Sequence, residues 1–542
     1  MKEEIKKFFK GEVFDDERTL IQYSKDASLF EVRPKLVVWP QNAEDLENLV
    51  RFINERKQTE PELSLTMRAA GSDMTGGPLN NSIIADVTKH INKIGDVSAT
   101  GTTVEPGAYY HSFEEKTLKK DLILPCYPAS KNLAALGGMI ANNCGGERTL
   151  RYGKMENFVS ESKYIFSDGK EYVVKPLSRS ELEAKIVQND FEGNIYKQVH
   201  ELIEANKEAI EKAKPKVTKN SSGYFLWNVD NGTTFDLNRL LTGSQGTLGL
   251  MTEAKLRLVQ DVKHHDMVAL FFKSWDELPQ VVSAIMPFEP EDLETFDDDT
   301  LRLGIRFMPE IAKKVGSNLL SFASQFIPEA FIGMKMLGFP ELIVLVEIGE
   351  GTEEEVKRKV KGIVKAIKPF KVWHRVIQKD SEEEKFWVMR RESFNLLREH
   401  VKDKRTVPLV EDFCIDIHKI PEFLPRAKEI LESQGINVNI AGHAGNGNFH
   451  IIPLMDLRDE NERAKLIPVA ERFYSLVHEF GGSISGEHND GIVRTPFLNK
   501  MYSPEMLGLF KKTKQIFDPK NIFNPGKKVG GTLEDFKAHL AR

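Results

Sequence analysis

Cysteine is scarce in this sequence, with only 3 among 542 residues. Cys126, Cys144 and Cys414 stand far apart, so they offer neither a disulfide framework nor the four-cysteine spacing of a zinc ribbon or an iron–sulfur cluster. If the chain is a redox enzyme, we therefore expect a separate acceptor to take its electrons.

An excess of basic charge is also absent. The chain has 75 basic and 81 acidic residues, a net charge of −6, and no long run of one sign, so we expect no nucleic-acid partner. The beginning, Met-Lys-Glu-Glu-Ile-Lys-Lys, lacks the apolar core of a signal peptide, and no stretch reaches about 18 apolar residues. These absences predict a cytoplasmic protein.

One apolar segment qualifies that prediction. Residues 319–339 are rich in Phe and Met and poor in charge. Such a run can make a peripheral contact with the inner face of a membrane or bind a partner protein, but it is more often buried beneath a neighbouring element. The sequence leaves these alternatives open.

The length of the chain exceeds what one core supports, so we expect two domains. Strands and glycine turns alternate with short helices between residues 65 and 136, which favours an α+β class over a doubly wound sheet. Asn42 is expected to cap a helix, and the alternating residues 250–259 are expected to form a strand. After residue 260 the pattern restarts and indicates an antiparallel sheet with helices on one face, with apolar central strands at 267–272 and 342–348. The predicted units are a helical lead-in (1–34), an N-terminal domain (35–260) with a helical insertion near 190–215, a C-terminal domain (261–528) and a tail (529–542).

Three glycine-rich segments interrupt the N-terminal domain, at residues 68–77, 136–146 and 241–249. Small residues at successive positions let backbone N–H groups approach an extended ligand or a phosphate closely. The first segment is not the Gly-x-Gly-x-x-Gly of a nicotinamide-binding helix. Taken alone, the first segment is equally well explained as a turn that needs glycine.

A pair of histidines brackets a short hairpin in the C-terminal domain, His443-Ala-Gly-Asn-Gly-Asn-Phe-His450, and Gly486-Glu487-His488 follows downstream. Asn446-Gly447 is typical of a two-residue type I′ turn. That turn would place the two histidines directly opposite each other, with Cβ atoms roughly 5 Å apart. Together with Glu487 they can bind one divalent ion, zinc or manganese. The alternative is a polar hairpin with two hydrogen-bonded histidines.

Taken in order, these segments and the terminal Asn524-Pro-Gly-Lys resemble the FAD-binding vanillyl-alcohol oxidase / p-cresol methylhydroxylase superfamily. The histidine hairpin with Glu487-His488 narrows the resemblance to its D-2-hydroxy-acid dehydrogenases, such as D-lactate and D-2-hydroxyglutarate dehydrogenases and the FAD subunit of glycolate oxidase. The resemblance covers residues 35–528. It implies a two-part FAD-binding domain and a C-terminal substrate domain whose end returns to the flavin.

The resemblance also implies which residues contact FAD. The family's pyrophosphate loop corresponds to Arg68, Ala69, Ala70, Gly71, Ser72, Asp73 and Met74. The flavin contacts correspond to Pro128, Ala129, Ser130, Gly137, Gly138, Asn142 and Gly145, with Leu248 and Gly249 at the adenosine half and Asn524 closing over the flavin. Family members with covalent flavin carry a histidine just after the first loop glycines, and this chain has none between residues 70 and 73. We therefore expect non-covalent FAD.

The implied reaction is oxidation of a 2-hydroxy acid to the 2-oxo acid, with hydride transfer to flavin N5. His488 neighbours a predicted metal ligand and is the predicted base, with a structural role as the alternative. Arg390 occupies the position of the family's carboxylate-binding arginine, although solvated helix arginines are common. Ile452 stands where hydroxyglutarate-specific members carry asparagine, which favours a small, uncharged substrate such as D-lactate.

Two other functions are weighed against this one. An enzyme like alkyl-glycerone-phosphate synthase would use the same fold without net redox, but the expected run of adjacent histidines is missing. A flavin-binding subunit of a larger oxidase would be expected to lack the metal hairpin. For the leading hypothesis, the predicted electron acceptor is an electron-transfer flavoprotein, an iron–sulfur protein or a quinone.

Overall fold

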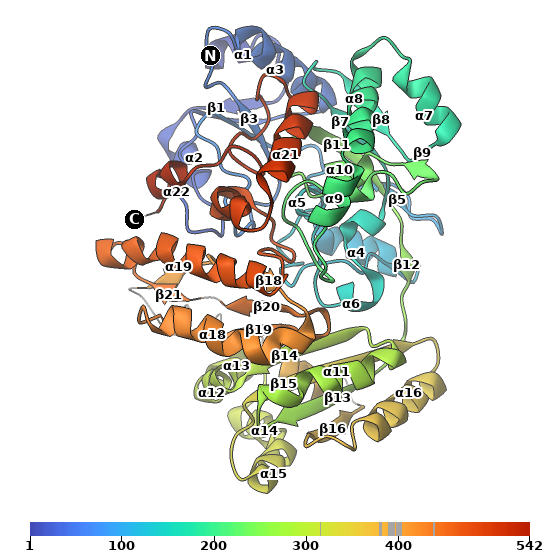
Figure 1. The fold of residues 1–542 in the computed structure, drawn as a ribbon, viewed down its shortest axis with the longest axis vertical. Helices are drawn as coiled ribbons and strands as arrows, with labels where there is room; N and C mark the ends of the chain where they lie inside the picture. Colours follow the sequence, from blue (N-terminus) through green and yellow to red (C-terminus); the bar gives the residue numbers. More distant parts are fainter. Residues whose placement is uncertain are drawn as a thin grey trace.

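The computed structural model describes residues 1–314, 316–378, 382–388, 396, 404–436, 439–451 and 453–541. Figure 1 shows two parts along the long axis: an N-terminal part joined by the last C-terminal segments, and a second part built on one large sheet. This two-domain α+β arrangement is the predicted fold class. Among the described residues, no helix combines the length and the apolar character needed to cross a membrane.

The first sheet of the N-terminal part leads directly into the loop at residues 68–74. Its strands lie in the order β1-β2-β4-β3, with β2, β4 and β3 parallel and β1 antiparallel to β2. Their apolar side chains pack against α3, whose start is capped as predicted, because the Asn42 side chain accepts a hydrogen bond from the Asp45 N–H. The bounds are β1 Glu12–Phe14, β2 Leu36–Trp39, α3 Ala43–Arg56, β3 Leu65–Arg68 and β4 Ile83–Asp86.

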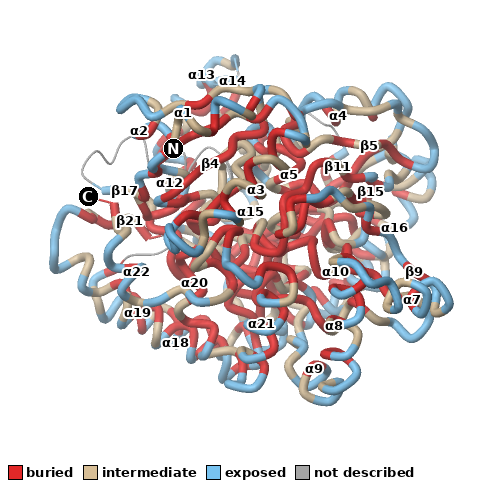
Figure 2. The backbone as a smooth tube through the Cα atoms, turned by 90° about the horizontal axis from the view of Figure 1, so that it is seen from above, coloured by how far each residue is buried: buried red, intermediate tan, exposed pale blue. Residues whose placement is uncertain are grey.

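The second sheet of this part is antiparallel, in the order β5-β11-β7-β8. The alternating pattern after residue 250 forms β11, as predicted. The predicted helical insertion is present as α8 and α9, and α9 projects at the edge of the molecule (Figure 2). The bounds are β5 Thr102–Val104, α4 Tyr110–Leu118, α5 Leu136–Asn142, α6 Thr149–Tyr152, β7 Val159–Ile165, β8 Glu171–Val174, α7 Arg179–Ile186, α8 Phe191–Ala205, α9 Lys207–Ala213, α10 Asn238–Leu241 and β11 Leu250–Leu256.

The second part is organised by a seven-stranded antiparallel sheet in the order β16-β13-β15-β14-β19-β20-β18. One face packs against α11 and α16, which follow the predicted central strands β13 and β15. The bounds of the strands are β13 His264–Phe272, β14 Asp292–Asp297, β15 Leu342–Glu350, β16 Trp373–Ile377, β18 Phe413–Cys414, β19 Ile440–His443 and β20 Asn448–Ile451. The helices on this face are α11 Leu278–Ile285, α16 Glu353–Ala366, α18 Ile420–Glu432 and α19 Glu460–Glu479.

Helices also cover part of the opposite face, which corrects the prediction of helices on one face only. Phe271 and Ile343 of the sheet pack against Met336 and Phe386 there. Most side chains of β13 and β15 are apolar on both faces of the sheet, and such strands need to be covered on both faces. Met336 belongs to α15 (Ile327–Met336), which lies in the Phe/Met-rich segment 319–339.

The two ends of the chain, residues 1–34 and 529–541, are integrated into the first part of the molecule. Between two short helices, α1 Lys2–Ile5 and α2 Glu17–Gln22, the lead-in contributes β1 to the first sheet, so the expected helical lead-in is only partly helical. At the other end, α22 Leu533–Ala538 buries Phe536 against Phe30 with ring centroids 5.1 Å apart. The two ends of the chain therefore pack against each other.

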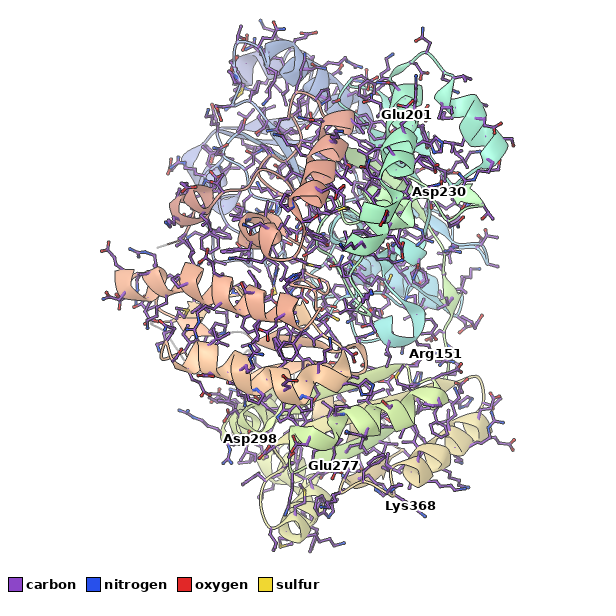
Figure 3. All side chains as sticks on the ribbon, in the orientation of Figure 1. Arg151, Glu201, Asp230, Glu277, Asp298 and Lys368 are labelled. Carbon is purple, nitrogen blue, oxygen red and sulfur yellow. The ribbon has the colours of Figure 1, made fainter. Side chains whose placement is uncertain are left out.

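The two parts meet beside Arg151, which Figure 3 labels near the upper edge of the large sheet. Its guanidinium donates to the Gly349 carbonyl at 2.7 Å and pairs with Glu350 at 3.1 Å. Tyr152 donates its hydroxyl to the buried Glu291 at 3.0 Å. These contacts join α6 of the first part to the end of β15 and to the residue before β14 in the second part.

Candidate active site

The histidine hairpin is formed by β19 and β20, but its turn differs from the prediction. Residues 444–446 form a 3-10 turn, and only Gly447 has a left-handed φ, of 65°. His443 therefore pairs with Asn448 and His450 pairs with Ala441, so the histidines are diagonal rather than directly opposite. Diagonal neighbours still share a face of the sheet. The type I′ turn was wrong, whereas the shared face is confirmed.

The imidazoles and Glu487 converge on one point. His443 Nε2 and His450 Nε2 each lie 3.4 Å from the same carboxylate oxygen, Glu487 Oε1. Both Nδ1 atoms face away, that of His443 to the Glu294 carboxylate and that of His450 to the Glu411 carbonyl at 3.0 Å. Metal-bound histidines show this pattern, because the outward N–H bond orients the ring and leaves the inward lone pair for the ion. The donor set fits a divalent metal, with two nitrogens and one oxygen.

Carboxylates that the sequence did not single out surround these ligands. Glu411, fully buried, pairs through Oε1 with Arg494 at 2.5 Å and through Oε2 with His488 Nδ1 at 2.8 Å. Asp412, also fully buried, accepts hydrogen bonds from the backbone N–H groups of Glu487 at 3.0 Å and His488 at 2.7 Å. Adjacent to the β18 strand, these two acids hold the segment that carries Glu487 and His488.

Buried charges shift the pKa values of the cluster. Burial alone would raise the pKa of Glu487, but Lys219, 3.3 Å from its Oε2, and His443 hold the pKa well below its usual range. Burial lowers the pKa of His488, yet the Glu411 and Asp412 carboxylates outweigh it and raise that pKa to about 9. The buried carboxylates therefore favour positive charge on the groups beside them, as the raised pKa of His488 shows.

The predicted flavin segments are tied together around Asp73. Its Oδ2 accepts hydrogen bonds from the N–H groups of Thr75 and Gly77, each at 2.8 Å, and its Oδ1 accepts one from Asn142 Nδ2 at 2.8 Å. The backbone at residues 68–74 remains partly exposed, and a Cβ at Gly138 would lie 3.8 Å from the Ala69 side chain with nothing closer. Two segments far apart in sequence thus face each other across small residues, as an extended cofactor requires.

The third glycine segment and the C-terminal end join the same assembly. Gln245 Nε2 donates to Asn142 Oδ1 at 3.2 Å. Asn524 donates to the carbonyls of Gly77 at 2.9 Å and Gln245 at 2.7 Å, and accepts from Thr66 Oγ1 at 2.8 Å. The buried Asn524 amide therefore joins the glycine segments. Sequence reasoning missed Gln245 and Thr66 as members of this network.

The other predicted cofactor contacts fall into two groups. Ala129 and Ser130 are exposed and Pro128 is half-buried, so their surface is open to a ligand. Leu248 and Gly249 are buried, and a Cβ at Gly249 would lie 3.1 Å from the Ile165 carbonyl. A close backbone approach inside the protein is one reason for this glycine.

The flavin segments reach the metal-type cluster at Gly145. A Cβ at this position would lie 3.3 Å from Glu487 Oε2. Lys154, close by in sequence, donates to the Gly486 carbonyl at 2.8 Å. A cofactor lying along the second glycine segment would therefore end beside the histidines and Glu487.

Two known protein families match the two parts of the chain. The family described as "FAD binding domain" matches residues 34–175, and that described as "FAD linked oxidases, C-terminal domain" matches residues 262–528. Residues 262–528 therefore belong to the FAD-linked oxidase C-terminal family, and residues 34–175 belong to the FAD-binding family. The first two glycine segments lie in the FAD-binding domain, and the histidine cluster lies in the C-terminal oxidase domain.

Curated relatives of this chain are named for hydroxy acids. A D-2-hydroxyglutarate dehydrogenase of Pseudomonas putida is 25% identical over 96% of this chain and 50% of its own length. A D-lactate dehydrogenase of Archaeoglobus fulgidus is 26% identical over 91% of each chain. A substrate-bound crystal structure of p-cresol methylhydroxylase shares the fold, with a TM-score of 0.66 and 15% identity over 95% of this chain and 93% of that one. The chain spans about half the length of the first curated relatives it matches.

Two predicted residues of the site lie outside the residues that the structure describes. They are Arg390, the predicted carboxylate clamp, and Ile452, the residue on which the substrate argument depends. Their contributions stay predictions.

Proposed function

We propose that the protein oxidises a D-2-hydroxy acid of the D-lactate type to the 2-oxo acid, using non-covalent FAD and a divalent metal, zinc or manganese. One observation carries the proposal. His443 Nε2 and His450 Nε2 converge on Glu487 Oε1, and Gly145 of the flavin-type segment lies against the same carboxylate. A redox cofactor and a cation would then meet at one substrate.

Both groups suit the residues that would hold them. His443, His450 and Glu487 would bind the metal, and the half-exposed backbone at 68–74 with Gly138 leaves room for the cofactor. When bound, FAD accepts the hydride from the substrate carbon, and the metal ion acts as a Lewis acid that acidifies the hydroxyl. A chelated hydroxy acid would be fixed in one orientation, which favours reaction by proximity.

His488 is proposed to take the hydroxyl proton. Its Nδ1 is engaged by Glu411 at 2.8 Å, so Nε2, which lies 3.6 Å from Glu487 Oε1, is the atom on the side of the ligand cluster. The carboxylates raise the pKa of His488 to about 9, so the ring is a strong proton acceptor. A cation bound at the ligand atoms would offset the effect of these carboxylates on the pKa and favour neutral imidazole, which is the form that can accept the proton.

The substrate class follows from charge and from the relatives' names. Both relatives are named for D-2-hydroxy acids. We propose that Arg390 pairs with the substrate carboxylate and that Ile452 favours a small, uncharged side chain over a second carboxylate. The electrons would leave through a separate acceptor, an electron-transfer flavoprotein, an iron–sulfur protein or a quinone, since the chain has only three scattered cysteines.

Anaerobic bleaching of the flavin by a panel of D- and L-2-hydroxy acids tests this proposal. D-lactate should bleach it fastest, a chelator should abolish bleaching while FAD stays bound, and zinc or manganese should restore it. Preference for an L-acid, or for D-2-hydroxyglutarate over all others, would overturn the substrate assignment. Bleaching that continues after the metal has been removed would overturn the metal's role.

A further inference from the structure

The exposed apolar surface of this protein is concentrated in one segment. Fourteen large hydrophobic side chains are exposed among the described residues, and eight of them fall between residues 305 and 339. We call six of these the apolar end patch: Leu320 (83% exposed), Ile327 (54%), Phe331 (57%), Met334 (60%), Leu337 (90%) and Phe339 (54%). Scattered exposed apolar residues are ordinary, but a concentration of this kind marks an interaction surface.

The helix α15, Ile327–Met336, is apolar on two sides. Met336 is fully buried and Ile332 packs beside it under the large sheet, and these fix the inner side. Ile327, Phe331 and Met334 follow the i, i+4, i+7 spacing of a single helix face, and all three are exposed. The alternative that the segment is buried beneath a neighbour is therefore wrong for this face.

Neighbouring elements extend the exposed surface. The α14 helix, Leu319–Ser324, carries Leu320 and is connected to the start of α15 through the Phe322 and Phe326 rings, 5.5 Å apart. At the other end α15 stops at Leu337, whose φ is 57°, and Phe339 follows two residues later. The patch therefore continues from one helix across the next and into its terminal turn.

Basic side chains accompany the patch. Between residues 300 and 339 there are five basic and two acidic residues, a net charge of +3 in a chain whose net charge is −6. One of the acids, Glu329, points inward to Lys385 at 3.1 Å. The Arg302 guanidinium lies 5.0 Å from the Phe339 ring centroid but pairs with Asp298 at 3.2 Å. The side chains of Arg306 and Lys335, by contrast, are exposed. The surface thus combines apolar and cationic groups.

The combination of apolar and cationic side chains indicates which kind of partner this surface binds. A second copy related by a two-fold axis would place the same positive patch on both sides, and like charges would oppose the contact. An anionic lipid surface complements both properties, because apolar side chains enter the acyl boundary while Lys and Arg pair with headgroups. Figure 1 shows α14 and α15 at the end of the long axis opposite α1 and α3, where a flat surface can reach them.

We propose that the apolar end patch, with the exposed Arg306, Lys313 and Lys335, docks the protein on an anionic lipid bilayer as a peripheral contact. The docking is independent of the reaction proposed above. It requires no change of fold, because the side chains that would enter the lipid are already exposed.

Co-flotation of the FAD-loaded protein with vesicles tests this docking. The protein should float with phosphatidylcholine–phosphatidylglycerol vesicles and much less with phosphatidylcholine alone, and raising the salt from about 0.1 M to about 1 M should weaken binding. The variant Phe331→Ser/Met334→Ser should bind the mixed vesicles at least about tenfold more weakly, because two side chains no longer enter the apolar layer. Lys313→Glu/Lys335→Glu should weaken binding comparably, whereas the matched control Val173→Ser/Val187→Ser, exposed outside the patch, should bind like wild type.

Three results would overturn the docking proposal. The first is that the protein does not float with the mixed vesicles, and the second is that the patch variant and the control lose vesicle binding equally. The third is that the wild type binds no vesicles and forms a dimer in light scattering that the patch variant abolishes. Unchanged thermal unfolding of each variant shows that the surface alone was altered. Flavin bleaching in solution is a separate measurement, so its failure would count against the proposed reaction and leave the vesicle result standing.

Discussion

The metal-type cluster and the flavin-type segments lie next to each other but are built in opposite ways. The cluster consists of buried charged side chains, His443, His450 and Glu487, each oriented by a further buried partner. The flavin segments consist of backbone and small residues, joined by amide side chains such as Asn142 and Asn524. A cation is bound by a few directed atoms, whereas an extended cofactor is bound by a long surface.

The difference predicts how each region fails. The cluster should be sensitive to the loss of a single side chain, because each ligand is a large fraction of the binding energy. The flavin segments should be sensitive to added bulk, because their function depends on close approach. Substitutions of these two kinds can therefore separate metal function from cofactor binding.

Loss of a ligand should have the largest effect. His443→Ala removes one of two nitrogen donors, so flavin reduction by a D-2-hydroxy acid should fall by about 1,000-fold or more, because several kcal/mol of charge stabilisation are lost. Bound FAD should remain, since Gly138 and residues 68–74 are unchanged. Rapid-mixing absorbance and acid-released FAD measure the two quantities. Undiminished reduction would contradict the ligand role.

A larger side chain in the flavin segments should have the next largest effect, a loss of FAD affinity. At Gly138 a Cβ meets nothing closer than Ala69 at 3.8 Å, so Gly138→Val should fold and yet occupy space needed by FAD. Overpacking costs about 1–3 kcal/mol, so the FAD dissociation constant should rise about 5- to 150-fold. Gly508→Val, in α21 Pro504–Phe517 with open space around it, is the matched control. Equal FAD affinity in the two variants would show that FAD does not pass Gly138.

Loss of a carboxylate that orients a histidine ligand should weaken metal binding without removing the ligand itself. Glu294→Gln keeps the shape beside His443 Nδ1 but removes the charge, so the apparent metal dissociation constant should rise about 10- to 100-fold. Chelator competition measures it, and Glu289→Gln, an exposed glutamate of the same stretch, serves as the control. Unaltered metal affinity in Glu294→Gln would show that the pair does not orient the imidazole.

The smallest expected effect is electrostatic and lies beside the first glycine loop. Burial, together with the nearby Asp73, raises the pKa of Asp26 to about 7. Below that pH the carboxyl is neutral, and above it a negative charge faces the site expected for the FAD diphosphate. FAD affinity should therefore fall about three- to tenfold between about pH 6 and pH 8, since one added unit charge near an anion costs of order 1 kcal/mol.

Asp26→Asn should flatten this pH profile, whereas Asp16→Asn, at the exposed start of α2, should retain it. Fluorescence titration of apoprotein with FAD at each pH measures the affinity. Burial also lowers the pKa of the nearby Lys527 to about 8, so any fall that persists in Asp26→Asn above that pH belongs to the lysine. An identical profile in wild type and Asp26→Asn would contradict the assignment to Asp26.

Much of the local structure was predictable because it depends on neighbours in sequence. The Asn42 cap, the alternation of β11 and the apolar strands β13 and β15 all appear where the pattern indicates. The hairpin turn was not predictable, since Asn446-Gly447 alone does not set the register. Pairing of β19 with β14 and of β18 with β20 constrains that hairpin, and these contacts are distant in sequence.

The candidate site shows the same division. The sequence supplied His443, His450 and Glu487 because their spacing has a chemical meaning, and the structure brings them together. It did not single out Glu294, Glu411 or Asp412, because their spacing in the sequence matches no ligand motif. Only the packing of strands places them against the histidine rings and the backbone of Glu487 and His488.

The sequence by itself determined the identity of the chemical groups: glycine-rich segments for a cofactor, imidazoles and a carboxylate for a cation, and too few cysteines for an iron–sulfur cluster. Tertiary structure decided their relations. It set the diagonal register of the histidines, the contact of Gly145 with Glu487, and the exposure of the apolar end patch. The physical reason is that residue chemistry and helical or strand period are local, whereas burial and contact depend on what other parts of the chain cover.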